Sequence, residues 1–129
     1  MKTLKNIKVL LVYLFFTISI SLSAQDFTEI TKSLSIGDVE SFSSFFDSNP
    51  ELTILEEEAI YSKTQIKTIL KDFFGKHKPS AYNTVHHGNS GNGAFFEIGE
   101  LTTSTNVYRT YLYAKKINGK FLIQEFRIE

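Results

Sequence analysis

The second half of this 129-residue chain contains four runs rich in β-branched and aromatic residues, separated by three short turn sequences. The runs occupy residues 80–129, and the turns fall near residues 89–92, 104–106 and 118–119. Runs bounded by Asn, Gly and Ser in this way are typical of strands joined by tight turns. The sequence therefore predicts a long antiparallel meander of four strands, which restricts the fold more than any other feature of the chain.

The Asn-Gly turn at residues 118–119 also predicts how the last two strands pair. Asn-Gly between two β-rich runs favours a two-residue hairpin. In that register Tyr113 lies opposite Gln124, and Tyr111 lies opposite Phe126. Because side chains alternate between the two faces of a strand, a shift of one residue would exchange the faces of every pair.

Two short helices are predicted at the start of the domain. Asp26 and Glu29 fit a capping box, an apolar stripe follows at helical spacing, and Gly37 ends this first helix. Asp38 opens a second short helix with a phenylalanine-rich face, and Asn49-Pro50 closes that segment. The domain therefore begins with two helices joined by Gly-Asp.

A strand pair and a third helix are predicted next. Residues 51–55 and 59–61 have strand patterns on either side of three consecutive glutamates, whose side chains fan apart and suit a solvated turn better than a calcium site. Ser62 and Gln65 then form a second capping box ahead of an apolar helical face, which Gly75 ends.

The N-terminus has the layout of a secretory signal peptide. Three lysines within the first eight residues precede the apolar run 9–20, and small or polar residues follow. We expect a signal peptide over residues 1–24, cleaved after Ala24 or alternatively after Ser23, and one domain over residues 25–129. The run is shorter than the roughly 20 apolar residues of a spanning helix. This favours a periplasmic or secreted protein without stable membrane insertion over the alternative of a membrane anchor.

Composition narrows the classes of function. The chain has no cysteine, which excludes disulfides and the lipid-modified cysteine of a lipoprotein. It has 14 basic and 14 acidic residues, and loss of the three N-terminal lysines leaves the domain mildly acidic. Nucleic-acid binding normally requires a basic stripe that neutralises several phosphates. The sequence therefore favours a protein that does not bind nucleic acid.

The order of these elements resembles the NTF2-like cone fold, which ketosteroid-isomerase-like and polyketide-cyclase-like enzymes share. More narrowly, "ELTIL", "YSKTQIKTILKDFF", "VHHG", "YRTYLYAKK" and "FLIQEFRIE", behind a signal peptide, are similar to a secreted bacterial family, domain of unknown function 4783. The resemblance implies an α+β fold in which three N-terminal helices pack on a curved, mainly antiparallel sheet. It implies no activity, because none is assigned to that family.

His86 and His87 are neighbours just ahead of a glycine-rich turn and invite a metal-site hypothesis. They fall near the end of a strand, where successive side chains point to opposite faces, so they cannot jointly bind one ion. Zinc needs about four ligands, and the chain lacks cysteine. We therefore expect no metal and no other cofactor.

A pocket can be predicted by following the alternation of side chains through the proposed turns. One face combines aromatic rings with polar groups, and Gly99 opposite Tyr111 leaves room between them. In ketosteroid-isomerase-like relatives alternate residues of the last strand line the cavity, so the resemblance implies that this face is concave. The predicted lining residues are Tyr82, His86, Glu97, Arg109, Tyr111, Tyr113, Gln124 and Phe126. Such a mixture suits a small organic ligand or an extended peptide.

Three functions are compatible with this face. The preferred one is a non-catalytic binding or interaction module, although the same side chains could simply fill the cone, with Glu97 paired to Arg109 or to a tyrosine. An enzyme like the ketosteroid isomerases or cyclases would use Glu97 as general base, with Tyr113 or His86 stabilising an oxyanion. The catalytic acid pair of those relatives is not recognisable in this sequence.

The third function is a homodimer, or a complex with another envelope protein, formed through the sheet face that the helices leave uncovered. Isologous pairing requires a contiguous apolar patch. On the predicted register that patch consists of Val85, Phe96, Ile98, Leu112 and Ile123.

Overall fold

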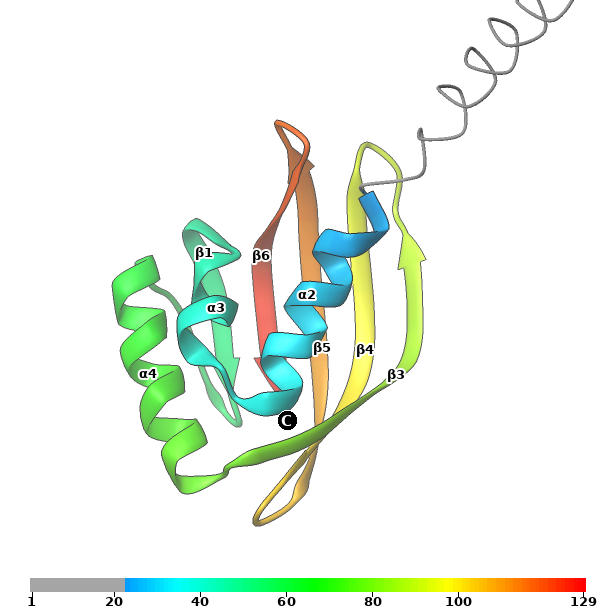
Figure 1. Cartoon of the computed structure of the whole chain (residues 1–129). Coiled ribbons are helices and arrows are strands. Elements are labelled where there is room, and N and C mark those ends of the chain that lie inside the picture. The colour runs from blue at the N-terminus through cyan, green and yellow to red at the C-terminus, as the bar shows by residue number, and fades with distance from the viewer. Residues whose placement is uncertain (1–22) are drawn as a thin grey trace, which may run out of the picture.

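The computed structural model describes residues 23–129 and the side chains from Phe27 onward (Figure 1). In chain order the described residues form helix α2 (Ser23–Ile36), helix α3 (Val39–Ser44), strands β1 (Phe46–Ile54) and β2 (Glu57–Ile60), helix α4 (Lys63–Lys76), and strands β3 (Pro79–Asn89), β4 (Ala94–Thr103), β5 (Val107–Ile117) and β6 (Lys120–Ile128). The predicted signal peptide lies almost wholly outside this range. None of the described helices has the length and apolar character needed to cross a membrane.

The end of α2 and the starts of α3 and α4 lie at their predicted signals. Gly37 ends α2 in a left-handed conformation, with a φ of 69°, although the helix starts at Ser23, before the predicted cap. Asp38 caps α3 by accepting a hydrogen bond from the backbone N–H of Ser41. Ser62 caps α4 in the predicted capping box, and Gly75 lies inside the last turn of that helix instead of ending it.

The second helix is shorter than predicted, because Phe46 belongs to a strand. Helix α3 ends at Ser44, and Phe46 starts β1, where it pairs with Ile123 of β6. The Phe46 ring is fully buried, in edge contact with Phe42 at 5.3 Å and with Phe126 at 6.3 Å. Pairing and burial against a distant part of the chain therefore decide the conformation of this segment.

The six strands form one curved sheet in the order β2-β1-β6-β5-β4-β3 (Figure 1). The predicted meander is confirmed as β3 to β6, and β1 against β6 is the single parallel pair of the described sheet. The α+β class and the curved sheet are as predicted. The placement of three helices ahead of the sheet needs correction, since α4 follows the β1–β2 hairpin and only α2 and α3 precede the first strand.

The hydrophobic core lies between the helices and the face of the sheet that they cover. Helix α2 crosses this concave face, with α3 and α4 beside it toward β1 (Figure 1). Leu101, Leu112, Phe126 and Ile128 point into the core from the sheet and meet the buried apolar faces of the helices. We call this the covered face, and the opposite one the open face.

The last hairpin has the predicted turn but a different register beyond it. Asn118 and Gly119 both have positive φ, and the predicted pairing holds as far as Ala114 opposite Ile123. A bulge at Gln124 then shifts the pairing by one residue, so that Tyr113 lies opposite Glu125 and Tyr111 opposite Arg127. The two pairs predicted from the turn, Tyr113 with Gln124 and Tyr111 with Phe126, are wrong for this reason.

The pairing of β4 with β5 is also shifted by one residue from the prediction. Gly99 lies opposite Thr110, where Tyr111 was expected. The β5 residues buried on the covered face are therefore Tyr108, Thr110, Leu112 and Ala114. The open face carries Arg109, Tyr111 and Tyr113.

Candidate functional site

The covered face carries a buried carboxylate on β4, which two hydroxyl groups of the edge strand β3 hold. Glu97 is 5% exposed. The Tyr82 hydroxyl donates to its Oε2 at 2.7 Å, and the Thr84 hydroxyl donates to its Oε1 at 3.0 Å. Within the described residues Glu97 has no ion-pair partner. We call Tyr82, Thr84, Glu97, Gly99 and Thr110 the polar layer.

Tyr82 fills the space in this layer where a ligand was expected. A Cβ built on Gly99 would stand 2.3 Å from the Tyr82 hydroxyl oxygen, so the ring of Tyr82 lies directly over the glycine. Gly99 does leave room, as the sequence indicated, but a side chain of the protein occupies that room. The alternative in which Glu97 is paired to a tyrosine describes this part of the molecule.

Electrostatics keep Tyr82 a neutral donor. Burial raises the pKa of its phenol strongly, and the hydrogen bond to the Glu97 carboxylate raises it further. The Thr110 hydroxyl is buried beside it and has a small opposing influence on that pKa, but its geometry is not that of a formed hydrogen bond. A neutral tyrosine and a threonine thus satisfy both carboxylate oxygens without a cation.

The eight residues predicted to line one pocket do not share a face. Tyr82, Glu97 and Phe126 lie on the covered face, and Gln124 lies in the β6 bulge, where its amide donates to Asp47 Oδ2 at 2.9 Å. The other four belong to the open face, because of the register shifts in β5 and the bulge in β3. These four are His86, Arg109, Tyr111 and Tyr113. The predicted pocket therefore does not form as a single site.

The two histidines point to opposite faces, as predicted from the pleat. His86 pairs with Ile98 and contacts the Phe96 ring at 5.7 Å on the open face, whereas His87 pairs with Glu97. Across the described part of the chain, His, Asp and Glu residues form no group of three able to hold a metal ion.

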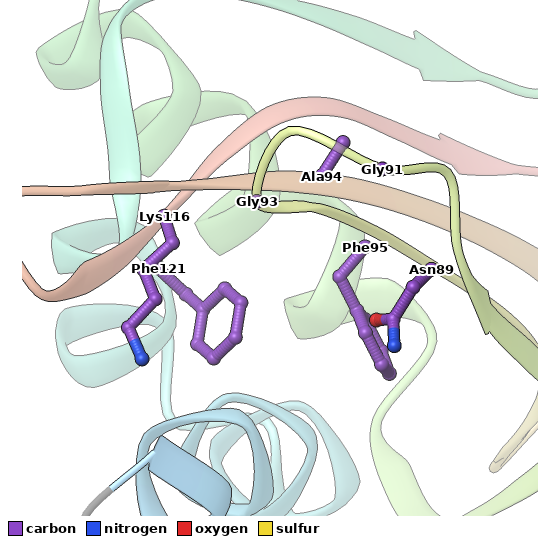
Figure 2. A pocket seen from close by; sticks show the side chains of 7 residues that line it. All are labelled: Asn89, Gly91, Gly93, Ala94, Phe95, Lys116 and Phe121. Carbon is purple, nitrogen blue, oxygen red and sulfur yellow. The ribbon is translucent and has the colours of Figure 1, made fainter.

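A pocket of about 450 Å³ lies at one end of the covered face, where the β3–β4 turn, the β5–β6 hairpin and the start of α2 come together (Figures 1 and 2). Its lining residues are Asn89, Gly91, Gly93, Ala94, Phe95, Lys116 and Phe121. In Figure 2 the rings of Phe95 and Phe121 extend side by side from the sheet toward the helix. We call this the mouth pocket. Neither Glu97 nor Tyr82 lines it.

Three phenylalanine rings form the wall of this end of the cone. Phe27 of α2 contacts Phe95 at 4.2 Å and Phe121 at 5.7 Å between ring centroids, and the last two rings are 6.0 Å apart. His87 stacks on the outer side of this cluster, nearly parallel to Phe95 at 6.0 Å. Offset and edge contacts of this kind hold aromatic rings in defined positions.

The glycine-rich turn shapes the pocket through its backbone. Gly91, Asn92 and Gly93 all have positive φ, a conformation that glycine adopts without strain. The Gly93 carbonyl accepts a hydrogen bond of 2.8 Å from the backbone N–H of Lys116, which ties the turn to β5. The turn predicted near residues 89–92 is confirmed, since β3 ends at Asn89 and β4 begins at Ala94.

A second pocket of about 400 Å³ adjoins the mouth pocket and shares Phe121 with it. Its lining residues are Glu29, Ser44, Phe45, Lys120, Phe121 and Leu122. Sequence reasoning did not identify the residues that line these two pockets, among them Phe95, Lys116, Lys120 and Phe121. Their signal is weak, because they come from three separate elements that only the fold brings together.

The open face carries a half-buried apolar patch formed by Phe96, Ile98, Tyr111 and Tyr113 on the neighbouring strands β4 and β5. Leu112 and Ile123, which were expected in this patch, are buried under the helices instead. Beside the patch, Arg127 pairs with Glu125 and, at 3.7 Å, with Glu51.

The helices and curved sheet have an NTF2-like fold. An NTF2-like protein of unknown function from Shewanella oneidensis is similar over 81% of this chain and 93% of its own, with a TM-score of 0.60 and 13% identity. A cystatin-like protein from Nostoc punctiforme has a TM-score of 0.62 and 17% identity over 82% of this chain and 86% of its own. At these identities the likeness shows the fold alone.

The sequence profile of domain of unknown function 4783 matches residues 27–129, and the chain belongs to that family. A family member from Bacteroides uniformis covers 79% of this chain and 94% of its own at 22% identity, with a TM-score of 0.74. Another, from Bacteroides fragilis, covers 78% and 93% at 23% identity, with a TM-score of 0.73. No curated protein matches the chain.

Proposed function

We propose that this protein is a non-catalytic binding module whose ligand occupies the mouth pocket. The observation that carries the proposal is the space of about 450 Å³ bordered by the Phe95 and Phe121 rings at the surface of the cone. Ligand sites are typically concave, largely apolar and of a few hundred Å³, with a small number of polar groups. The mouth pocket has these properties, with Asn89 and Lys116 as its polar side chains.

The polar layer supports a binding function over an enzymatic one. A general base must come within hydrogen-bonding reach of the proton that it removes. Both oxygens of Glu97 already accept hydrogen bonds from Tyr82 and Thr84, and the Tyr82 ring covers the adjacent Gly99. A substrate would have to displace Tyr82 or Thr84 before it could reach the carboxylate.

We also propose that the protein acts outside the cytoplasm, because three lysines and an apolar run precede the domain. The mass of the protein recovered from its host tests this proposal. A mature chain that starts near Gln25 is expected, and a full-length chain would contradict export with cleavage.

The binding proposal can be tested with a neutral apolar dye, N-phenyl-1-naphthylamine, whose fluorescence rises in apolar surroundings. We expect saturable binding at one site, and Phe121→Ala should weaken it about tenfold, because one aromatic wall of the pocket is lost. Phe96→Ala is the matched control, since it removes a half-buried phenylalanine from the open face. Absence of binding, or equal losses in the two variants whose folding is verified by circular dichroism, would refute the mouth pocket as the site.

A second candidate function is self-association through the open face. A contiguous apolar patch there consists of Phe96, Ile98, Tyr111 and Tyr113. An isologous dimer would bury the patch of each copy against that of the other. Light scattering across a range of concentrations should show a mass that rises to that of a dimer, and Ile98→Glu should restore the monomer. A constant monomeric mass at high concentration would rule this candidate out.

A further inference from the structure

We infer that the mouth pocket selects a small amphiphilic anion, with an aromatic body and a single negative group. This inference rests on the proposed binding function and specifies the class of its ligand. It starts from the rim of the pocket. Lys116 lines the mouth pocket and Lys120 lines the adjoining one, and both project from the β5–β6 hairpin.

These two lysines are exposed at the surface. Among the described residues neither has an ion-pair partner, whereas Lys67, Lys76 and Arg127 all do. Glu29 is the one acidic side chain among the residues lining the two pockets. The rim therefore favours a ligand with negative charge and disfavours a cation.

The positive charge stands next to the apolar wall. The Lys116 ammonium nitrogen lies 5.6 Å from the centroid of the Phe121 ring, within the range of a cation–π contact. Phe121 belongs to both pockets, so a ligand lying against its ring would come close to Lys116, and Lys120 lines the adjoining pocket. Figure 2 shows the Lys116 side chain running alongside Phe121. This juxtaposition matches a molecule with an aryl body and an anionic group at one end.

The shape of the site points to an aromatic molecule of limited size. Volumes of about 450 Å³ and about 400 Å³ suit a small organic molecule and lie within the usual range for such sites. The wall is made of phenyl rings in edge and tilted contacts, a geometry that a further ring can extend.

A pair of dyes tests the inference directly. 8-Anilinonaphthalene-1-sulfonate has the same ring system as N-phenyl-1-naphthylamine and adds one sulfonate. At low salt we expect the sulfonate to bind about threefold to tenfold more tightly than the neutral dye, because exposed charge pairs contribute modestly. The preference should shrink at about 1 M salt, where the screening length falls to about 3 Å.

Substitutions locate the anion site. The double variant Lys116→Gln and Lys120→Gln should remove the preference for the sulfonate, so that the two dyes bind with equal affinity. Lys115→Gln is the matched control, because Lys115 is the neighbouring lysine on the open face and lines neither pocket. Near-ultraviolet circular dichroism of each variant verifies that the dyes report on folded protein.

The outcomes separate the two proposals. Equal affinity for both dyes would overturn the anion preference while the binding function stands. Failure of both dyes to bind would overturn the binding function and this inference together. A loss of sulfonate binding in Lys115→Gln as large as in the double variant would overturn the assignment of the anion site to the mouth pocket.

Discussion

The polar layer and the mouth pocket are neighbouring levels of the same covered face, yet one is closed and the other is open. Phe95, Glu97 and Gly99 follow one another on that face of β4. At Gly99 the ring of Tyr82 fills the room that the missing side chain leaves, while beside Phe95 the mouth pocket remains. A glycine on a concave face therefore does not predict a cavity, because a neighbouring large side chain can occupy its place.

The polar layer and the mouth pocket also differ in the interactions that stabilise them. The polar layer has directional hydrogen bonds to a buried carboxylate, and removal of one partner leaves a polar group unsatisfied. The mouth pocket is held by ring contacts at the surface, and its rings are partly exposed. We therefore expect substitutions in and below the polar layer to change mainly the stability, and substitutions at the mouth to change mainly binding.

The largest expected effect is the difference in stability between alanine variants of two phenylalanines of β6. Phe126 is fully buried and makes edge contacts with Phe42 at 5.0 Å and with Phe46, so Phe126→Ala should lower the free energy of unfolding by about 3–5 kcal/mol. Phe121→Ala, at the partly exposed mouth, should lower it by about 1 kcal/mol. Chemical denaturation monitored by circular dichroism measures both. Equal losses would mean that the mouth is part of the structural core.

A smaller effect is expected from a methyl group added at the closed level. In Gly99→Ala the new Cβ would collide with the Tyr82 ring and push its hydroxyl away from Glu97, at a cost of about 2–3 kcal/mol in the free energy of unfolding. Gly75→Ala is the control, because its Cβ would meet nothing within 4 Å in α4. Alanine is the better helix former, so this variant should be equally stable or more stable by up to about 1 kcal/mol. A tolerated Gly99→Ala would show that the closed level has spare room.

Caps and turns that depend on residues close together in the sequence could be predicted. The Ser62–Gln65 capping box, the end of α2 at Gly37 and the Asn118-Gly119 hairpin all depend on groups within a few positions of one another. The order of the strands in the meander follows from these turns. Local chemistry of this kind is readable without knowledge of the rest of the fold.

The faces of the last strands were not predictable, because a distant contact accompanies the shift in register. Gln124 lies in the β6 bulge and its amide donates to Asp47, 77 positions earlier in the chain. That hydrogen bond also lowers the pKa of Asp47. Because side chains alternate between faces, the bulge moved Tyr111 and Tyr113 out of the predicted pocket. The mouth pocket was missed for a related reason, since Phe27, Phe95 and Phe121 meet only in the folded chain.

The smallest expected effect comes from removing the hydroxyl oxygen of Tyr82. Tyr82→Phe keeps the ring over Gly99 and removes one of the two donors to Glu97, so the free energy of unfolding near pH 7 should fall by about 1 kcal/mol. Tyr111→Phe on the open face is the control, because within the part of the chain that the structure describes the Tyr111 hydroxyl makes no hydrogen bond to the polar layer. Its effect should stay within about 0.5 kcal/mol.

The same variant should change how stability depends on pH in alkaline solution. Burial and Glu97 raise the pKa of Tyr82 in the folded protein, so above about pH 10 the unfolded chain releases a proton that the folded chain retains. The raised pKa of Tyr82 therefore leaves the free energy of unfolding unaffected by pH below about pH 10 and lowers it as the pH rises further. Between about pH 9 and about pH 11, Tyr82→Phe should therefore lose stability less steeply than the wild type in denaturation experiments. Burial also raises the pKa of Tyr111, but less strongly, so Tyr111→Phe should show a smaller change of the same sign. Parallel losses in the wild type and Tyr82→Phe would mean that Tyr82 is solvated, and the closed level would then be open to ligands.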